Sequence, residues 1–129
     1  MNVNLILAIA MGGACGAVLR HFFNHVVATI LGTDFPYGIL LANVLGSFIM
    51  GIFISSFALF WDVSQLTKAF LTVGLLGAFT TFSTFSLDAV LLYERGEYVM
   101  SAIYIISSVI LSITALFLAM FLVRTLYSA

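Results

Sequence analysis

The segment from Gly74 to Phe85 reads GLLGAFTTFSTF and lies within a stretch that is otherwise apolar enough to cross a lipid bilayer. Its glycines loosen the helical backbone, and its hydroxyl groups compete for backbone hydrogen bonds. Unpaired backbone groups are not tolerated against lipid, so such a segment must be buried in protein or line a polar cavity. The sequence therefore predicts a helix broken at mid-membrane depth, with the functional centre at the break.

The composition indicates an integral membrane protein. Of the 129 residues, 64% are hydrophobic and only 7% are charged, which is too few to cover a water-soluble domain. The net charge of -1 argues against nucleic acid as a partner. The single cysteine, Cys15, excludes an internal disulfide framework. No basic stretch precedes the first apolar segment, which is also too long for a cleaved signal, so we expect a retained span.

Four apolar segments are separated by the few charged side chains, and each exceeds the roughly 20 residues that cross a bilayer as a helix. We expect helices near residues 4–31, 36–60, 66–93 and 98–125. Aromatic residues that prefer membrane interfaces stand near their ends: Tyr37, Trp61, Tyr93, Tyr98 and Tyr127. The predicted fold is therefore all-α, a single transmembrane domain over residues 1–129 whose third helix is broken.

The cationic residues give no clear orientation to these spans. One side of the membrane would carry Lys68 and Arg124, and the other Arg95, with Arg20 nearer to that side. Such a chain lacks the bias that normally fixes topology, so copies inserted both ways could pair as an antiparallel, dual-topology dimer. The alternative is that a bias outside this simple count orients the chain.

Two sets of polar residues in the first helix have different interpretations. A guanidinium as deep as that of Arg20 is costly in a membrane, so it either anchors the structure or attracts anions, and these roles are compatible. His21 and His25 share a face but have no third ligand nearby. We interpret both histidines as interfacial side chains and not as a metal site.

Polar side chains also recur inside the second and fourth helices. Asn43 and Ser47 share one face of the second helix, where the amide either bonds another helix or lines a pathway. The fourth helix carries a stripe at intervals of three and four, which favours a lined pathway over isolated backbone bonds by serine: Ser101, Tyr104, Ser108 and Ser112.

Phe82 and Phe85 share a face of the third helix, with Ser83 and Thr84 between them. The common fate of phenylalanine is core packing, yet the positive edge of a ring can also face an anion without adding charge. The only carboxylate in this helix, that of Asp88, lies toward its end. A lining of amide, hydroxyl and ring-edge hydrogens, with one arginine, favours a small anion.

These residues give the chain a resemblance to the Fluc/CrcB fluoride ion channels over essentially its whole length. Three motifs carry it in the right order: GGACGAVLR from Gly12, YGILLANVLG from Tyr37 and GLLGAFTTFSTFS from Gly74. The third motif is highly specific. The resemblance implies an antiparallel homodimer in a bacterial inner (plasma) membrane, with two fluoride pores and passive fluoride export that protects the cell.

The resemblance also implies roles for individual residues. Phe82 and Phe85 would offer ring edges to fluoride, and Asn43 would donate from the second helix. The polar track would comprise Ser83, Thr84, Tyr104, Ser108 and Ser112, with Arg20 at the vestibule. A structural sodium ion would sit at the dimer centre, held by the carbonyls of Gly77 and Thr80 from both copies.

Four positions depart from the family pattern, and we expect changed rates but retained function. Ile39 replaces a threonine, Ala78 a glycine, His21 an aromatic residue and Asp88 a glutamate. The sequence leaves open whether the chain pairs with itself or with a sister subunit.

Three other kinds of protein are weaker interpretations. A small dual-topology multidrug transporter would need an embedded carboxylate in the first helix, where this chain carries Arg20 instead. A non-transporting assembly subunit would leave the hydroxyl stripes without a purpose. An enzyme is the least favoured, because no nucleophile stands beside a plausible base.

Overall fold

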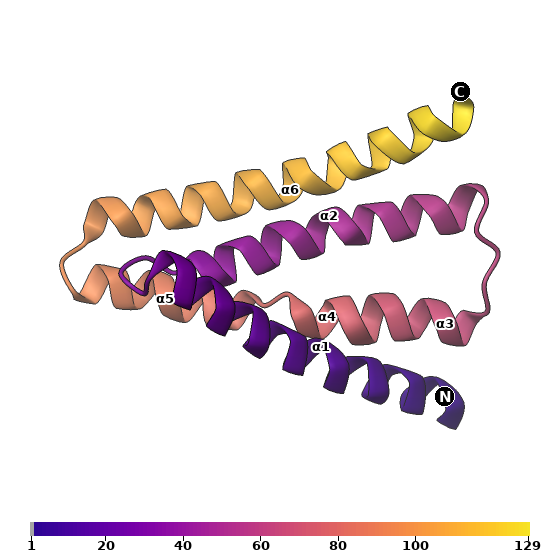
Figure 1. The fold of residues 1–129 in the computed structure, drawn as a ribbon, viewed down its shortest axis with the longest axis horizontal. Helices are drawn as coiled ribbons and strands as arrows, with labels where there is room; N and C mark the ends of the chain where they lie inside the picture. The colour runs from indigo at the N-terminus through magenta and orange to yellow at the C-terminus, as the bar shows by residue number, and fades with distance from the viewer. Residues whose placement is uncertain (1) are drawn as a thin grey trace.

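The computed structural model describes residues 2–129, in which every regular element is a helix (Figure 1). The elements are α1 (Val3–Leu31), α2 (Tyr37–Leu59), α3 (Gln65–Ala69), the π-helix η1 (Phe70–Leu76), α4 (Gly77–Phe79), α5 (Phe82–Glu94) and α6 (Tyr98–Ser128).

Four helical segments are long and apolar enough to cross a membrane: α1, α2, the run from Gln65 to Glu94, and α6. This confirms the prediction of an all-α chain with four candidate spans, and the observed bounds differ from the expected ones by at most three residues. We refer to Gln65–Glu94 as the third span. It contains α3, η1, α4 and α5 in sequence.

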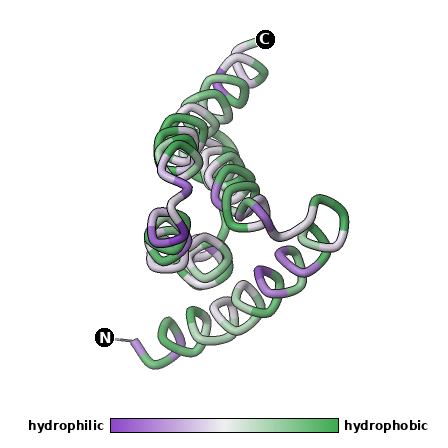
Figure 2. Tube along the Cα trace, turned by 90° about the vertical axis from the view of Figure 1, so that its left-hand side faces the viewer, coloured by the Kyte–Doolittle hydropathy of each residue, from purple (hydrophilic) through white to green (hydrophobic). Residues whose placement is uncertain are grey.

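The spans run back and forth between two ends of the molecule (Figure 1). Both chain ends and the α2–α3 connection lie at one end, and the other two connections lie at the opposite end. Arg95 in the α5–α6 connection donates to the Asp34 carbonyl of the α1–α2 connection at 3.4 Å, which links the two connections. Within its own connection Arg95 pairs with Glu97 at 2.9 Å. Hydrophobic residues dominate the trace along the helices (Figure 2).

A small apolar core lies where α2, α5 and α6 meet. Its buried members are Ile39, Phe85, Ala89, Leu92 and Tyr104. Most other large apolar side chains, on all four spans, are exposed on the surface of the single chain. That distribution is expected for helices whose outer faces contact lipid or another protein.

Glycines bring α1 into backbone contact with η1. A Cβ atom at Gly16 would meet the Leu75 carbonyl oxygen, and one at Gly12 would meet that of Phe70. Gly74 has the same role on η1, because a Cβ there would lie 2.8 Å from the Ile9 carbonyl oxygen of α1. Close approach through small residues is typical of membrane helices. The contact with α1 fixes the position of η1, which immediately precedes α4.

Replacing Gly16 with alanine should destabilise the protein by about 1–3 kcal/mol, because the methyl group would overlap backbone that cannot move aside. Gly13→Ala is the matched control on the same helix, since a Cβ there meets nothing within 4 Å. Unfolding in mixed detergent micelles would measure both variants. Equal stability of the two variants would contradict the proposed packing.

Candidate functional site

Thr80 and Thr81 separate α4 from α5 and have extended backbone, with ψ of 157° and 128°. We call these two residues the Thr80–Thr81 linker. The Thr80 amide and hydroxyl both donate to the Leu76 carbonyl at 3.0 Å. The Thr81 hydroxyl accepts from the Thr84 amide at 3.2 Å and so caps α5. The hydroxyls of the motif thus satisfy the helix ends on both sides of the linker.

Side chains from α1 and α2 bind the peptide groups of the linker. The Asn43 amide nitrogen donates to the Thr81 carbonyl at 3.0 Å, and its oxygen accepts from the Thr81 amide at 2.8 Å. Arg20 Nη1 donates to the Thr80 carbonyl at 3.3 Å. Gly46 lets α2 come this close, because a Cβ there would meet the Thr80 side chain.

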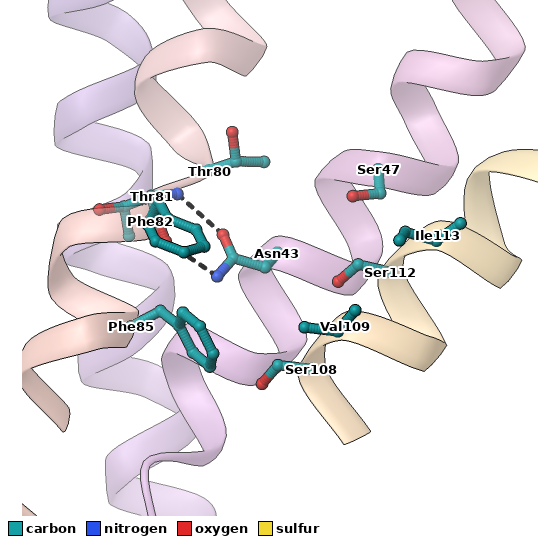
Figure 3. A pocket seen from close by; sticks show the side chains of 10 residues that line it. All are labelled: Asn43, Ser47, Thr80, Thr81, Phe82, Phe85, Ser108, Val109, Ser112 and Ile113. Atoms are coloured by element: carbon teal, nitrogen blue, oxygen red, sulfur yellow. Dashed lines mark hydrogen bonds between the residues drawn. The ribbon is translucent and has the colours of Figure 1, made fainter. Parts of the chain in front are cut away.

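A cavity of about 370 Å³ lies between α2, the linker with α5, and α6 (Figure 3). Every side chain that lines it is neutral: Asn43, Ser47, Thr80, Thr81, Phe82, Phe85, Ser108, Val109, Ser112 and Ile113. In the close view the two phenylalanine rings lie on the side opposite Ser108 and Ser112, with Asn43 between the two groups. Several polar residues predicted from sequence therefore share one cavity.

The two phenylalanines form an edge-to-face pair at the cavity wall. Their ring centroids are 5.4 Å apart with an interplanar angle of 62°. Phe85 is packed in the core, at 7% exposure, whereas Phe82 is 75% exposed in the single chain. Phe85 is therefore both a core residue and a cavity residue, so the two interpretations of this ring are compatible.

The hydroxyl oxygens of Ser108 and Ser112 are buried, and neither has a hydrogen-bond partner among the described residues. Buried polar atoms in folded proteins nearly always have a partner. Because both serines line the cavity, these hydroxyls are available to a ligand or water there.

The polar stripe on α6 divides into two pairs with different surroundings. Ser101 donates to the Ala89 carbonyl at 2.9 Å, and the fully buried Tyr104 donates to the Asp88 carboxylate at 3.2 Å. These two side chains bind α5 and do not line the cavity. Only the second pair, Ser108 and Ser112, does so.

Ser83 and Thr84 also lie outside this cavity. The Ser83 side chain is exposed, with its hydroxyl 3.4 Å from that of Thr81. Thr84 lines a second, more polar cavity of about 210 Å³ beside the α1–α2 connection, which Asn24, Ile39 and Asp88 also line. The structure therefore gathers part of the predicted polar track and places the rest elsewhere.

Two residues of the site were not among the predicted functional residues. Thr81 supplies the peptide that Asn43 binds, and Asp88 binds Tyr104. A sequence signal existed for Thr81, because a threonine just before a helical run is a typical N-cap. No local signal pairs Asp88 with a residue 16 positions away.

The carbonyls of Gly77 and Thr80 have the chemistry expected for a sodium ligand. The Thr81 amide, which would bond Gly77 in a continuous helix, donates to Asn43 instead. Likewise the Thr84 amide donates to the Thr81 hydroxyl and not to Thr80. Hard cations prefer oxygen ligands of this kind. The Thr80 carbonyl lacks its helical partner but accepts from Arg20 at 3.3 Å. Within residues 2–129 no group of three or more histidine, cysteine or acidic side chains is placed to hold a metal ion.

Residues 7–120 match the family described as CrcB-like protein, Camphor Resistance (CrcB). The chain belongs to this family. It is 47% identical over 120 residues to the fluoride-specific ion channel FluC of Rhodopseudomonas palustris (strain BisB5), covering 93% of this chain and 97% of the relative. The FluC protein of Granulibacter bethesdensis is 48% identical over 120 residues, 93% and 94% of the two chains. That of Nitrobacter winogradskyi is 46% identical over 126 residues, 98% and 100%.

Family membership and four apolar spans confirm the prediction of a multi-pass bacterial membrane protein. The family resemblance stated from sequence is also confirmed. The relatives are named as ion channels and not as enzymes, in agreement with the sequence.

Removing the Tyr104 hydroxyl should destabilise the protein by about 1–3 kcal/mol. Tyr104→Phe keeps the ring packing but leaves a partly buried carboxyl group without its donor. Tyr98→Phe is the control, because Tyr98 is 60% exposed at the start of α6. Unfolding of the two variants under identical detergent conditions provides the comparison. A Tyr104→Phe variant as stable as the control would show that the Asp88 contact contributes little.

Proposed function

We propose that this protein is a fluoride-selective channel that lets fluoride leave the cell down its gradient and so limits cytoplasmic fluoride. The observation that carries the proposal is the neutral cavity, whose unpaired serine hydroxyls face a pair of phenylalanine rings across Asn43. The relatives named as fluoride-specific ion channels support the same ion.

The chemistry of the lining suits a small, strongly hydrated anion. A pore must replace the water around the ion with donors of similar strength, and selectivity depends on their number, field and spacing. Ser108 and Ser112 offer hydroxyl hydrogens, and the rings of Phe82 and Phe85 offer positive edges. A larger halide gains less from short donor contacts, so the same lining disfavours chloride.

The pathway is proposed to be completed by a second, antiparallel copy of the chain, giving two pores, with the Thr80–Thr81 linker at mid-membrane depth. Two features support this arrangement. Phe82 is 75% exposed although it borders the cavity. The few cationic residues also show no bias toward either end, so opposite insertion of two copies is allowed.

A sodium ion is proposed as a structural cofactor held by the carbonyls of Gly77 and Thr80 and by their counterparts in the second copy. When bound, such an ion supplies positive charge that offsets the cost of a nearby anion in a low-dielectric setting. The contribution of the chain itself is to keep these carbonyls free of helical partners. Arg20 already donates to one of them and adds positive charge beside the cavity.

Liposomes that contain the purified protein should release fluoride far faster than chloride, because the neutral donors compensate only the smaller ion for its lost water. Ion-selective electrodes would record both fluxes from matched vesicles, with protein-free vesicles as the control. Equal rates for the two ions would reject fluoride selectivity.

Phe82→Ile should reduce fluoride flux by about tenfold or more, because isoleucine fills the space without a polarised ring edge, and each lost contact worth about 1.4 kcal/mol gives a factor of ten. Phe121→Ile is the matched control, since Phe121 is also exposed, at 63%, but lies on α6 outside the cavity. If both variants conduct like the wild type, the ring of Phe82 has no role in permeation.

A further inference from the structure

We propose that Asn43 is a positioning residue that keeps the Thr80–Thr81 linker out of helical conformation, and that it does so through a two-point contact with the backbone of Thr81. The inference rests on the proposed function in one respect, namely that the linker borders the proposed ion pathway. In this inference Asn43 positions the backbone of the linker, in addition to any hydrogen bond that it donates to the ion.

The contact satisfies both polar backbone groups of a single residue. The Asn43 oxygen accepts from the Thr81 amide at 2.8 Å while its nitrogen donates to the Thr81 carbonyl at 3.0 Å (Figure 3). A carboxamide carries an acceptor and donors side by side on one planar group, so it can pair with both the N–H and the C=O of one extended residue. One of its two N–H hydrogens is used here, which leaves the second for the cavity that Asn43 lines.

The competing conformation is a continuous third span. In that state the Thr81 amide would donate to the Gly77 carbonyl four residues earlier. Asn43 removes this donor, so closing the helix at this point would leave the Asn43 oxygen without its partner. The free Gly77 carbonyl and the extended Thr81 are therefore two consequences of the same hydrogen bond.

The surrounding packing holds the linker against α2, next to Asn43. Gly46, one turn further along α2, has no side chain and admits Thr80 against the helix. Arg20 on α1 donates to the Thr80 carbonyl at 3.3 Å. That carbonyl and the Thr81 amide belong to one peptide group, so this peptide is held from two different helices. Only the contact from α2 involves the amide that a continuous helix would need.

The test measures the length of the third span directly. Spin labels at Gln65 and Glu94, exposed residues at its two ends, would be introduced in a Cys15→Ser background. Labelled chains are diluted into excess unlabelled chains and reconstituted in liposomes, so that only distances within one chain are recorded. Closing two extended residues into a helix shortens the span by about 4 Å, from the difference in rise per residue.

Asn43→Leu should shorten this distance and lower fluoride flux by about tenfold or more. Asn43→Asp, measured at a pH low enough to protonate its carboxyl group, should keep the wild-type distance, because the acid then accepts from the Thr81 amide and donates to the Thr81 carbonyl as the carboxamide does. Ser47→Ala is the control for distance, since Ser47 lies one turn away on α2 and makes no contact with Thr81 through hydrogen bonds. If Asn43→Leu does not fold, Asn43→Ser replaces it, because a hydroxyl is too short to bridge both groups.

The outcomes separate the inference from the proposed function. A wild-type distance in Asn43→Leu or Asn43→Ser, whatever the flux, would overturn the positioning role. An Asn43→Asp distance at that low pH as short as that of Asn43→Leu would also overturn it, because an acceptor and a donor at this position would then not hold the linker. A shortened distance in Asn43→Leu, together with no fluoride flux through the wild-type protein, would reject the channel and leave the inference standing.

Discussion

Hydrogen bonding of the backbone around the Thr80–Thr81 linker is the constraint on which the rest of the site depends. A chain inside a bilayer has no water to satisfy peptide groups that leave a helix. Here four substitutes act together: the Asn43 amide, the Arg20 guanidinium, and the hydroxyls of Thr80 and Thr81. The linker is not helical, yet its backbone groups are hydrogen-bonded. The partners are a carbonyl of the motif itself and side chains of α1 and α2.

The pairing also decides which polar groups remain available. The Ser108 and Ser112 hydroxyls have no partner among the described residues, whereas Ser101 and Tyr104 on the same helix bind α5. The free hydroxyls lie at the cavity, beside the linker, and the bound ones lie nearer the α5–α6 connection. One stripe on α6 thus serves two purposes, attachment of α5 near its beginning and lining of the cavity further along.

The sequence was sufficient for the four apolar helical spans, because apolar length is a local property. The family resemblance assigned Asn43, Phe82 and Phe85 to one pore, and all three line one cavity. The sequence did not predict which groups these side chains contact. Helical periodicity puts Tyr104 and Ser108 on one face, but only packing decides that Tyr104 reaches Asp88 while Ser108 reaches the cavity. Similarly, the sequence marks Thr81 as a helix N-cap but does not reveal that Asn43 binds its backbone.

The single chain leaves the proposed pathway incomplete on one side, and this has a physical consequence. A phenyl ring exposed to lipid, such as that of Phe82, carries little penalty. An unpaired hydroxyl or carbonyl away from water is costly, and this chain has a buried hydroxyl without a partner at Ser112 and a carbonyl without its helical partner at Gly77. A second copy over the cavity would enclose these groups in a polar route. The arrangement that shields the unpaired groups is then the same arrangement that gives an anion a continuous series of donors.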